Sequence, residues 1–353
     1  MKAYHWGSLA LGLFVFLILA HRSEAAQTYT VQDLGVGDAI DAAGPNLSGQ
    51  VIVRSGFSTA RSFRITPSTA TGGSSGALLD SLGLLSGGNH TSANALNDAG
   101  AVVASANGRN TVRATMWTKT GGLQDLGALP GDSGSEAFGI NNAGAVVGYS
   151  GGPQGIRAFL WTASAGMQKL TALPGGDFSK AFGISDSGLI VGSSGSASGT
   201  RAVLWRSGGI QNLGTLPGGT TSEALGVNNR GSVVGYSLGV ADERAFIWTA
   251  QSGMRALDAL GGGTFGRALA INDSGDVVGV SGNSQNTRAV IWNAQGAVQD
   301  LNVLVSLPPG LVLSEAVGIN ARGQIVALAR DLGNTQNFHE GAHRVFLLTP
   351  SGS

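Results

Sequence analysis

Few side chains in this sequence are suited to acid–base chemistry. Three histidines lie beyond the first 25 residues: His90, His339 and His343. Glu340 follows His339 directly, and a histidine with a carboxylate in reach is a usual pair for general acid and base catalysis. Arg344 follows His343, and its planar guanidinium suits bidentate contacts with carboxylates or anionic sugars. This C-terminal segment is therefore the first candidate for a site.

A second set of charged residues recurs at nearly equal spacing and alternates in sign. Its members are Glu136, Lys180, Glu223, Arg267 and Glu315. If they lie on neighbouring repeats, opposite charges would set the register, and each exposed pair would contribute only ~0–1 kcal/mol. The competing interpretation is a polar lining that holds a small ligand. The candidate ligand-binding residues are then His90, Arg267, His339, Glu340, His343 and Arg344.

A repeated unit must position these residues. Five tryptophans stand at 117, 161, 205, 248 and 292, each four residues after an arginine. Degenerate copies of this pair are Arg61 with Ile65 and Arg344 with Leu348. Seven units therefore cover almost the whole chain after its first residues, and self-similarity at such a period is typical of stacked or circular repeat folds.

Each unit reads as four short strands. In one of them we expect strands over 135–141, 145–150, 157–162 and 167–173, with a six-residue loop over 151–156. The third strand is apolar on both faces, which predicts a sheet buried between neighbouring sheets. No segment shows sustained helical periodicity, so the fold class is all-β.

The two ends of the repeat array complement each other. The last unit stops after its third strand, over 343–349, while residues 29–35 resemble the fourth strands at 122–127 and 297–301. The sequence therefore predicts one domain over 26–353: a seven-bladed β-propeller of four-stranded blades, closed by the N-terminal strand in the last blade. An open solenoid would need capping repeats, and none is visible.

The N-terminal segment predicts export. Residues 1–25 combine a cationic start, an apolar run and small residues at 23 and 25, which is typical of a signal peptide. The apolar run is short of the ~20 residues needed to span a bilayer, so we expect no membrane span after its removal. The chain has no cysteine and a net charge near zero, which disfavours nucleic-acid binding. We expect a secreted or periplasmic monomer without cofactor or metal.

Three motifs in one unit carry a resemblance to a known family. Residues 222–228, 231–237 and 244–249 resemble the HAF family of extracellular bacterial repeats, and the likeness extends over all seven units. The histidine that names the family is arginine here in every unit. The resemblance implies an exported repeat protein without a settled activity, and it carries over no catalytic residue.

Departures from the regular unit gather where the ring is expected to close. The loop over 330–343 is much longer than its equivalents, the loop over 303–313 has extra residues, and the connection over 66–76 is rich in Ser, Thr and Gly. Long loops on a repeat scaffold are frequent binding elements. The other interpretation is that closure regions are irregular because they hold the termini.

Two repeated features have a structural and a functional interpretation. The arginine of each unit would either bind anionic sugars or hydrogen-bond neighbouring carbonyls and cover tryptophan. The run Asn272 to Asp276 would either bind calcium or form a plain hairpin turn, and the absence of EF-hand spacing favours the turn. No catalytic or zinc motif is present.

Three functions remain open at this point. The leading hypothesis is a non-enzymatic extracellular binding module that holds a glycan or another protein at the closure-side loops. The alternatives are an extracellular polysaccharide lyase or hydrolase, using histidine and glutamate, and a structural surface or matrix component.

Overall fold

The computed structural model describes residues 27–36, 39–56, 61–68, 78–207, 209–283, 286–333 and 343–352. The leader, most of the 66–76 and 330–343 loops, and with them His339 and Glu340, lie outside these residues. The described chain is built of β-strands with two short 3₁₀ turns, as the all-β prediction requires. None of its helices has the length and apolar character of a membrane span.

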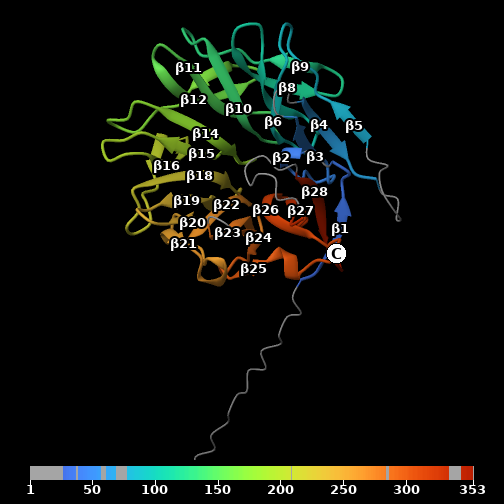
Figure 1. Cartoon of the computed structure of the whole chain (residues 1–353). Coiled ribbons are helices and arrows are strands. Elements are labelled where there is room, and N and C mark those ends of the chain that lie inside the picture. The colour runs from blue at the N-terminus through green and yellow to red at the C-terminus, as the bar shows by residue number, and fades with distance from the viewer. Residues whose placement is uncertain are drawn as a thin grey trace, which may run out of the picture.

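The strands fall into units of four, and the sheets fan around a common centre (Figure 1). Unit 1 contains β2 (Ala39–Ala43), β3 (Val51–Ser55), β4 (Arg61–Thr66) and β5 (Leu78–Ser81). Unit 2 contains β6 (Thr91–Leu96), β7 (Val102–Asn107), β8 (Val112–Thr118) and β9 (Gly122–Asp125). Unit 3 contains β10 (Gly134–Ile140), β11 (Val146–Gly152), β12 (Gly155–Thr162) and β13 (Gly166–Lys169). Unit 4 contains β14 (Ser179–Ile184), β15 (Ile190–Ser194), β16 (Arg201–Arg206) and β17 (Gly209–Asn212).

The C-terminal half continues this pattern. Unit 5 contains β18 (Thr221–Val227), β19 (Val233–Leu238), β20 (Glu243–Thr249) and β21 (Gly253–Ala256). Unit 6 contains η1 (Leu260–Gly262), β22 (Phe265–Ile271), β23 (Val277–Asn283), β24 (Asn286–Trp292) and β25 (Val298–Asp300). Unit 7 contains η2 (Leu301–Val303), β26 (Leu311–Ile319), β27 (Ile325–Asp331), β28 (Arg344–Pro350) and β1 (Tyr29–Asp33). A single parallel bridge from Glu243 to Phe265 joins the sheets of units 5 and 6.

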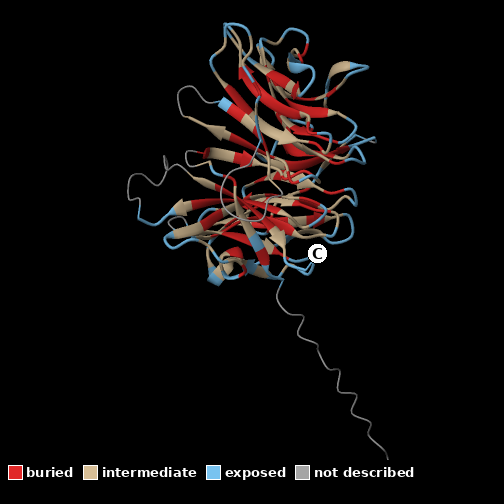
Figure 2. Cartoon of the chain, turned by 90° about the vertical axis from the view of Figure 1, so that its right-hand side faces the viewer, coloured by how far each residue is buried: buried red, intermediate tan, exposed pale blue. Residues whose placement is uncertain are grey.

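The middle strands of each unit are buried on both faces, as their sequences predict. Phe159 and Phe246 are fully buried, and so is Trp292 of β24. Figure 2 shows that burial runs through the strands, whereas exposed residues gather in the connecting turns. Burying one such side chain contributes about 1.5–3 kcal/mol, so stability comes from packing between sheets.

Two boundaries of the predicted unit are corrected. The fourth strand of unit 3 ends at Lys169 rather than at Leu173, because Leu173 leaves the sheet and donates its N–H to Ser194 Oγ of unit 4 at 3.0 Å. The expected six-residue loop over 151–156 is largely strand. Only two residues separate β11 from β12, because Gly155 adopts a positive φ of 87° that permits a tight turn.

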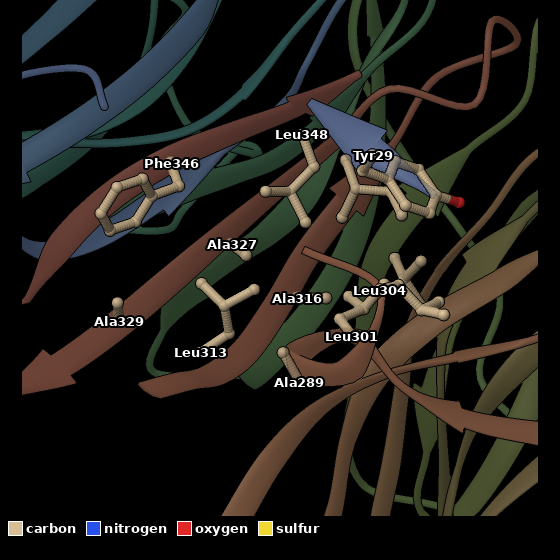
Figure 3. Packing of buried hydrophobic residues seen from close by; sticks show 12 residues of the cluster. Tyr29, Ala289, Leu301, Leu304, Leu313, Ala316, Ala327, Ala329, Phe346 and Leu348 are labelled. Carbon is tan, nitrogen blue, oxygen red and sulfur yellow. The ribbon is translucent and has the colours of Figure 1, made fainter. Parts of the chain in front are cut away.

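The N-terminal strand completes the sheet of the last unit, as the sequence predicts. β1 runs antiparallel to β28, with Val31 opposite Leu348. Tyr29 also donates its N–H to the carbonyl of Leu304 at 3.1 Å. Figure 3 shows the Tyr29 ring beside Leu348, within a buried cluster that Leu301 and Leu304 also join. Residues from both ends of the described chain therefore share one hydrophobic core.

Asparagine side chains join each unit to the next at the turn between the first two strands. The Nδ2 group of one turn donates to the main-chain carbonyl of the equivalent turn. These bonds run from Asn46 to Asn97 (3.0 Å), Asn97 to Asn141 (3.2 Å), Asn141 to Ser185 (3.1 Å), Asn228 to Asn272 (3.0 Å), Asn272 to Asn320 (3.5 Å) and Asn320 to Asn46 (2.8 Å). Ser185, at the equivalent position in unit 4, has no side-chain amide. Between units 4 and 5 the main-chain N–H of Ser187 instead donates to Asn229 Oδ1 at 2.9 Å.

Candidate functional site

The alternating charges of units 3 to 7 lie on the first strand of each unit, five residues before the first residue of the following turn. In unit 3 the Tyr149 hydroxyl donates to the carboxylate of Glu136. Lys180 of unit 4 places its ammonium 5.1 Å from the centre of the same tyrosine ring. Burial and Glu136 together raise the pKa of the Tyr149 hydroxyl. Opposite charges on neighbouring units are thus joined through an aromatic ring, which is favourable for both.

Units 5 and 6 repeat this arrangement with one addition. The guanidinium of Arg267 lies 4.8 Å from the ring centre of Tyr236, whose pKa is raised by burial and then by Glu223. Arg267 also forms a bidentate ion pair with Glu243, with Nη2 to Oε2 at 3.1 Å. Its charge is therefore committed to protein partners, and Arg267 is less available to a ligand than the sequence indicates.

The pattern fails between units 7 and 1. Glu315 is followed in the next unit by Asp41, so the charge that acts on Glu315 from this unit comes from a second carboxyl group instead of a base. Among the described residues, Glu315 has no ion pair and no side-chain hydrogen bond. Burial, with the charge of Asp41 as a smaller cause, raises the pKa of Glu315 to about 7. This carboxyl group is uncommitted near neutral pH.

His343 lies beside this pair. Its backbone exchanges hydrogen bonds with Ala39 of unit 1 at 3.2 and 2.9 Å. The Nδ1 atom is buried without a hydrogen-bond partner. Burial lowers the pKa of the His343 imidazole, and hydrogen bonding with the Ala329 backbone and then the charge of Asp41 partly oppose this shift. A neutral imidazole is therefore favoured next to the carboxyl pair.

Arg54 connects the pair to the histidine of unit 2. Its Nη2 lies 3.5 Å from Asp41 Oδ2, and its Nη1 donates to Ser92 Oγ at 2.6 Å. Burial and then the charge of Arg54 lower the pKa of His90. We name Asp41, Arg54, Glu315 and His343 the closure cluster.

The sequence predicted part of this arrangement. The structure brings His343 into the cluster and places His90 within the electrostatic reach of Arg54. Arg267 borders the cluster because its charge acts on Glu315. His339 and Glu340 lie outside the described residues.

Arg344 points away from the cluster. It pairs with Asp33 of β1 and lies 5.6 Å from the ring centre of Phe346. Equivalent arginines also use their charge locally: Arg113 lies 3.7 Å from Asp125, and Arg157 lies 2.5 Å from Asp132. These contacts favour the structural interpretation of the arginine series, and Arg344 belongs with that series.

Asp41 and Arg54 were not singled out from the sequence. Unit 1 is degenerate, and its first strand, Ala39–Ala43, lacks the Ser-Glu-Ala pattern of unit 3. Counting back from the turn asparagine would have found Asp41, because Asn46 stands five residues after it, as Asn141 does after Glu136. The turn is a better reference for alignment than the strand.

A hollow at the turns between the first and second strands was also not predicted from the sequence. It has a volume of about 430 Å³ and is lined by the turns between first and second strands. Asn142 Nδ2 bridges Asp98 and Asp186 at 2.7 and 2.9 Å, and both oxygens of Asp273 accept from Asn229. The run around Asp273 is a hairpin turn whose carboxylate is occupied by this network.

No metal-binding cluster forms in the described part of the chain, where no three His, Asp or Glu side chains come together suitably. The closure cluster instead offers two carboxyl groups, an imidazole and a guanidinium. Such a set can accept and donate hydrogen bonds to hydroxyl or amino groups.

Solved structures show what fold this is. A virginiamycin B lyase from Staphylococcus aureus is 11% identical with a TM-score of 0.55, covering 91% of this chain and 99% of that chain. A streptogramin B lyase is 11% identical with a TM-score of 0.54, covering 92% and 98%. The β-propeller domain of the Trilobed protease from Pyrococcus furiosus, which has an open velcro topology, is 8% identical with a TM-score of 0.53, covering 90% and 95%. No family model and no curated protein matches the sequence. The chain therefore has a β-propeller fold, and these likenesses extend no further than the fold.

Proposed function

We propose that the chain is a closed ring of seven blades, each blade being one unit. The pairing of β1 with β28 supports closure between the two ends of the described chain. The bond from Asn320 to the carbonyl of Asn46 supports it independently, because it joins the turn of unit 7 to that of unit 1. A ring removes the exposed sheet edges that an open array would have.

We further propose that this propeller is an exported, non-enzymatic binding protein that holds a glycan at the closure cluster. The observation that carries this proposal is the uncommitted carboxyl group of Glu315 beside Asp41. In units 3 and 5 the equivalent glutamates hydrogen-bond a tyrosine, so those positions are used internally. Among the described residues, Glu315 of unit 7 has no such tyrosine partner and keeps free hydrogen-bonding capacity.

A sugar hydroxyl suits this capacity better than a charged group does. A carboxyl group near half protonation both donates and accepts, and a hydroxyl does the same. Arg54 and His343 flank the pair, so a strongly cationic ligand would be repelled by the like charge of Arg54. Protein partners generally need a larger and flatter surface than the inner end of a blade provides.

Glycan-array screening followed by calorimetry tests this function. Glu315→Gln should weaken binding by about tenfold or more, because one hydrogen-bonding oxygen is replaced by an amide. Glu136→Gln is the matched control, since it changes the equivalent residue in unit 3, and it should leave affinity unchanged. Binding that is equally strong in both variants would exclude the closure cluster. If the propeller binds another protein and no glycan, its ligand is a protein partner and the glycan proposal is wrong.

One observation favours a second function, a polysaccharide-acting enzyme. At neutral pH a raised pKa at Glu315 keeps this carboxyl group partly protonated beside Asp41, whose pKa burial also raises, and a partly protonated carboxyl group is suited to general acid catalysis. Incubation of the protein with a polysaccharide panel, followed by detection of new reducing ends or unsaturated sugars, tests this. Turnover that is lost in Glu315→Gln, with the fold intact, would replace the binding proposal.

Export and the HAF likeness complete the proposal. The leader-like pattern in residues 1–25 supports secretion or transfer to the periplasm, and the repeat motifs support an extracellular setting. Mass spectrometry of the protein recovered from a bacterial host tests the leader. A mature N-terminus at Ala26 is expected, and recovery of the intact chain in the cytoplasm would contradict export.

A further inference from the structure

A serine hydroxyl seals the junction between neighbouring units in the middle of the chain. Ser135 Oγ accepts the N–H of Ala114 at 2.9 Å, and Ser222 Oγ accepts that of Ala202 at 2.9 Å. Ser179 does the same for Ala158 at 3.0 Å. In each junction the hydroxyl of the following unit's first strand reaches the third strand of the preceding unit.

The hydroxyls of units 3 and 5 also donate. Ser135 Oγ donates to the carbonyl of Gly127, and Ser222 Oγ donates to the carbonyl of Gly214, both at 2.5 Å. One hydroxyl thus satisfies a donor and an acceptor on the preceding unit at once. Such a seal leaves no room for a ligand at these two junctions.

Unit 6 lacks this hydroxyl. The equivalent residue is Gly266, which faces Ala245 of unit 5. A Cβ atom added at Gly266 would lie 3.4 Å from the Ala245 nitrogen and 3.5 Å from its Cβ, which are ordinary contacts. The backbone of Gly266 has no positive φ. Serine would therefore fit here as it does in units 3 to 5.

A cavity of about 210 Å³ occupies the unsealed junction. Its apolar wall includes Leu257, Phe265 and the fully buried Trp292. The Trp292 indole N–H is already bound to the carbonyl of Asp258 at 2.7 Å, so this donor is not available to a ligand. At ~30 Å³ for each water molecule, the cavity has room for about seven waters.

The polar groups of the cavity define the class of ligand. Asp242, Glu243 and Asp258 line it, and two of them are paired with cations: Asp242 with Arg244 and Glu243 with Arg267. Among the described residues, Asp258 has no ion pair. Arg244 is held by Asp242 at 3.0 Å and by the carbonyl of Pro217 at 2.7 Å. An anionic ligand would therefore be repelled, whereas hydroxyl groups can donate to the carboxylates. Apolar and aromatic walls with acidic hydrogen-bond acceptors suit the C–H face and the hydroxyls of a neutral sugar.

We propose that this cavity between units 5 and 6 binds one neutral sugar residue, with a ligand hydroxyl in the place that serine occupies at neighbouring junctions. We name it the Gly266 pocket. Its lining comes from units 5 and 6, whereas the closure cluster belongs to units 7 and 1, so the two sites are distinct. The proposal does not depend on which function the closure cluster has.

Gly266→Ser tests the pocket directly, because it introduces the hydroxyl that the chain itself uses elsewhere. Binding of glucose, galactose and mannose methyl glycosides is measured by saturation-transfer NMR and calorimetry. We expect the wild type to bind at least one of them. Gly266→Ser should weaken that binding by about tenfold or more, as is typical when a small pocket is filled. Its melting temperature should equal or exceed that of the wild type, because glycine is lost from a compatible backbone position.

Two further measurements make the outcome decisive. Gly266→Ala adds a methyl group without a hydroxyl and should weaken binding less than serine does, which also covers the case in which the serine variant folds poorly. Glu136→Gln lies in neither site and should leave binding of the methyl glycosides unchanged, whereas a sugar whose binding is lost in Glu315→Gln but kept in Gly266→Ser would be bound at the closure cluster instead. Absence of binding to every neutral sugar, equal binding of glucuronate, or affinity that is insensitive to Gly266→Ser would each overturn the proposal.

Discussion

The seam between units 7 and 1 should make the stability of the protein depend on pH through one residue. The pKa of Glu315 is raised from its ordinary value of 4.5 to about 7 in the folded protein. The fold therefore favours the protonated acid. Below pH 4.5, ionisation of Glu315 does not lower the free energy of unfolding. This free energy falls as pH rises from 4.5 to about 7, and the loss is complete above about pH 7.

The size of this penalty follows from the shift. Each pKa unit corresponds to 1.36 kcal/mol, so the shift of Glu315 corresponds to about 3 kcal/mol. Glu315→Gln removes the ionisation and should therefore stabilise the protein at pH 8 relative to pH 4 by about 3 kcal/mol, compared with the wild type. The raised pKa of Asp41 acts in the same direction, and the lowered pKa values of His90 and His343 act in the opposite direction, but all three groups are present in both proteins and largely cancel in the comparison.

Urea unfolding followed by tryptophan fluorescence at a series of pH values measures this difference. Glu136→Gln is the control, because Glu136 occupies the same place in unit 3 but accepts the Tyr149 hydroxyl. A difference between wild type and Glu315→Gln that is flat from about pH 4 to pH 8 would refute the reasoning. So would an equal pH dependence for the Glu136 variant, since the effect would then not belong to the seam.

Three other expectations follow from the packing. Deletion of residues 28–36 removes β1 and should lower the melting temperature of the whole domain in calorimetry, whereas an unchanged midpoint would contradict its role in closure. Asn141→Ala removes the amide bond to the Ser185 carbonyl and should cost about 1–3 kcal/mol in urea unfolding, as is usual when a buried hydrogen bond is lost. Gly148→Ala should prevent normal folding because its Cβ would lie 1.9 Å from a main-chain oxygen of β10, while Gly151→Ala in the same strand has no atom within 4 Å and should fold normally by circular dichroism.

Much of the fold was predictable because large side chains recur at the same position in successive repeats. The Arg and Trp spacing gave the period, and the similarity of residues 29–35 to other fourth strands predicted the pairing of β1 with β28. Buried tryptophan tolerates few replacements, so its spacing is a reliable marker of packing. The ends of strands were less predictable: Leu173 looks like a strand residue but packs between two units.

The site was only partly predictable because it depends on which units meet. The sign of each charge is visible in the sequence, but its partner is known only once Asp41 is placed beside Glu315. The Gly266 pocket shows a different limit. A glycine in place of serine reads as a minor substitution in a chain with 58 glycines, and its effect appears only when Ala245 is placed across the junction.

The asparagine bonds between turns have a consequence for how the molecule fails under load. Side-chain hydrogen bonds connect these turns to the equivalent turns of the next units. Force applied to a strand of one sheet would therefore be passed to the neighbouring units before that sheet unfolds. The longest of these bonds, from Asn272 to the Asn320 carbonyl at 3.5 Å, is then the one we expect to break first.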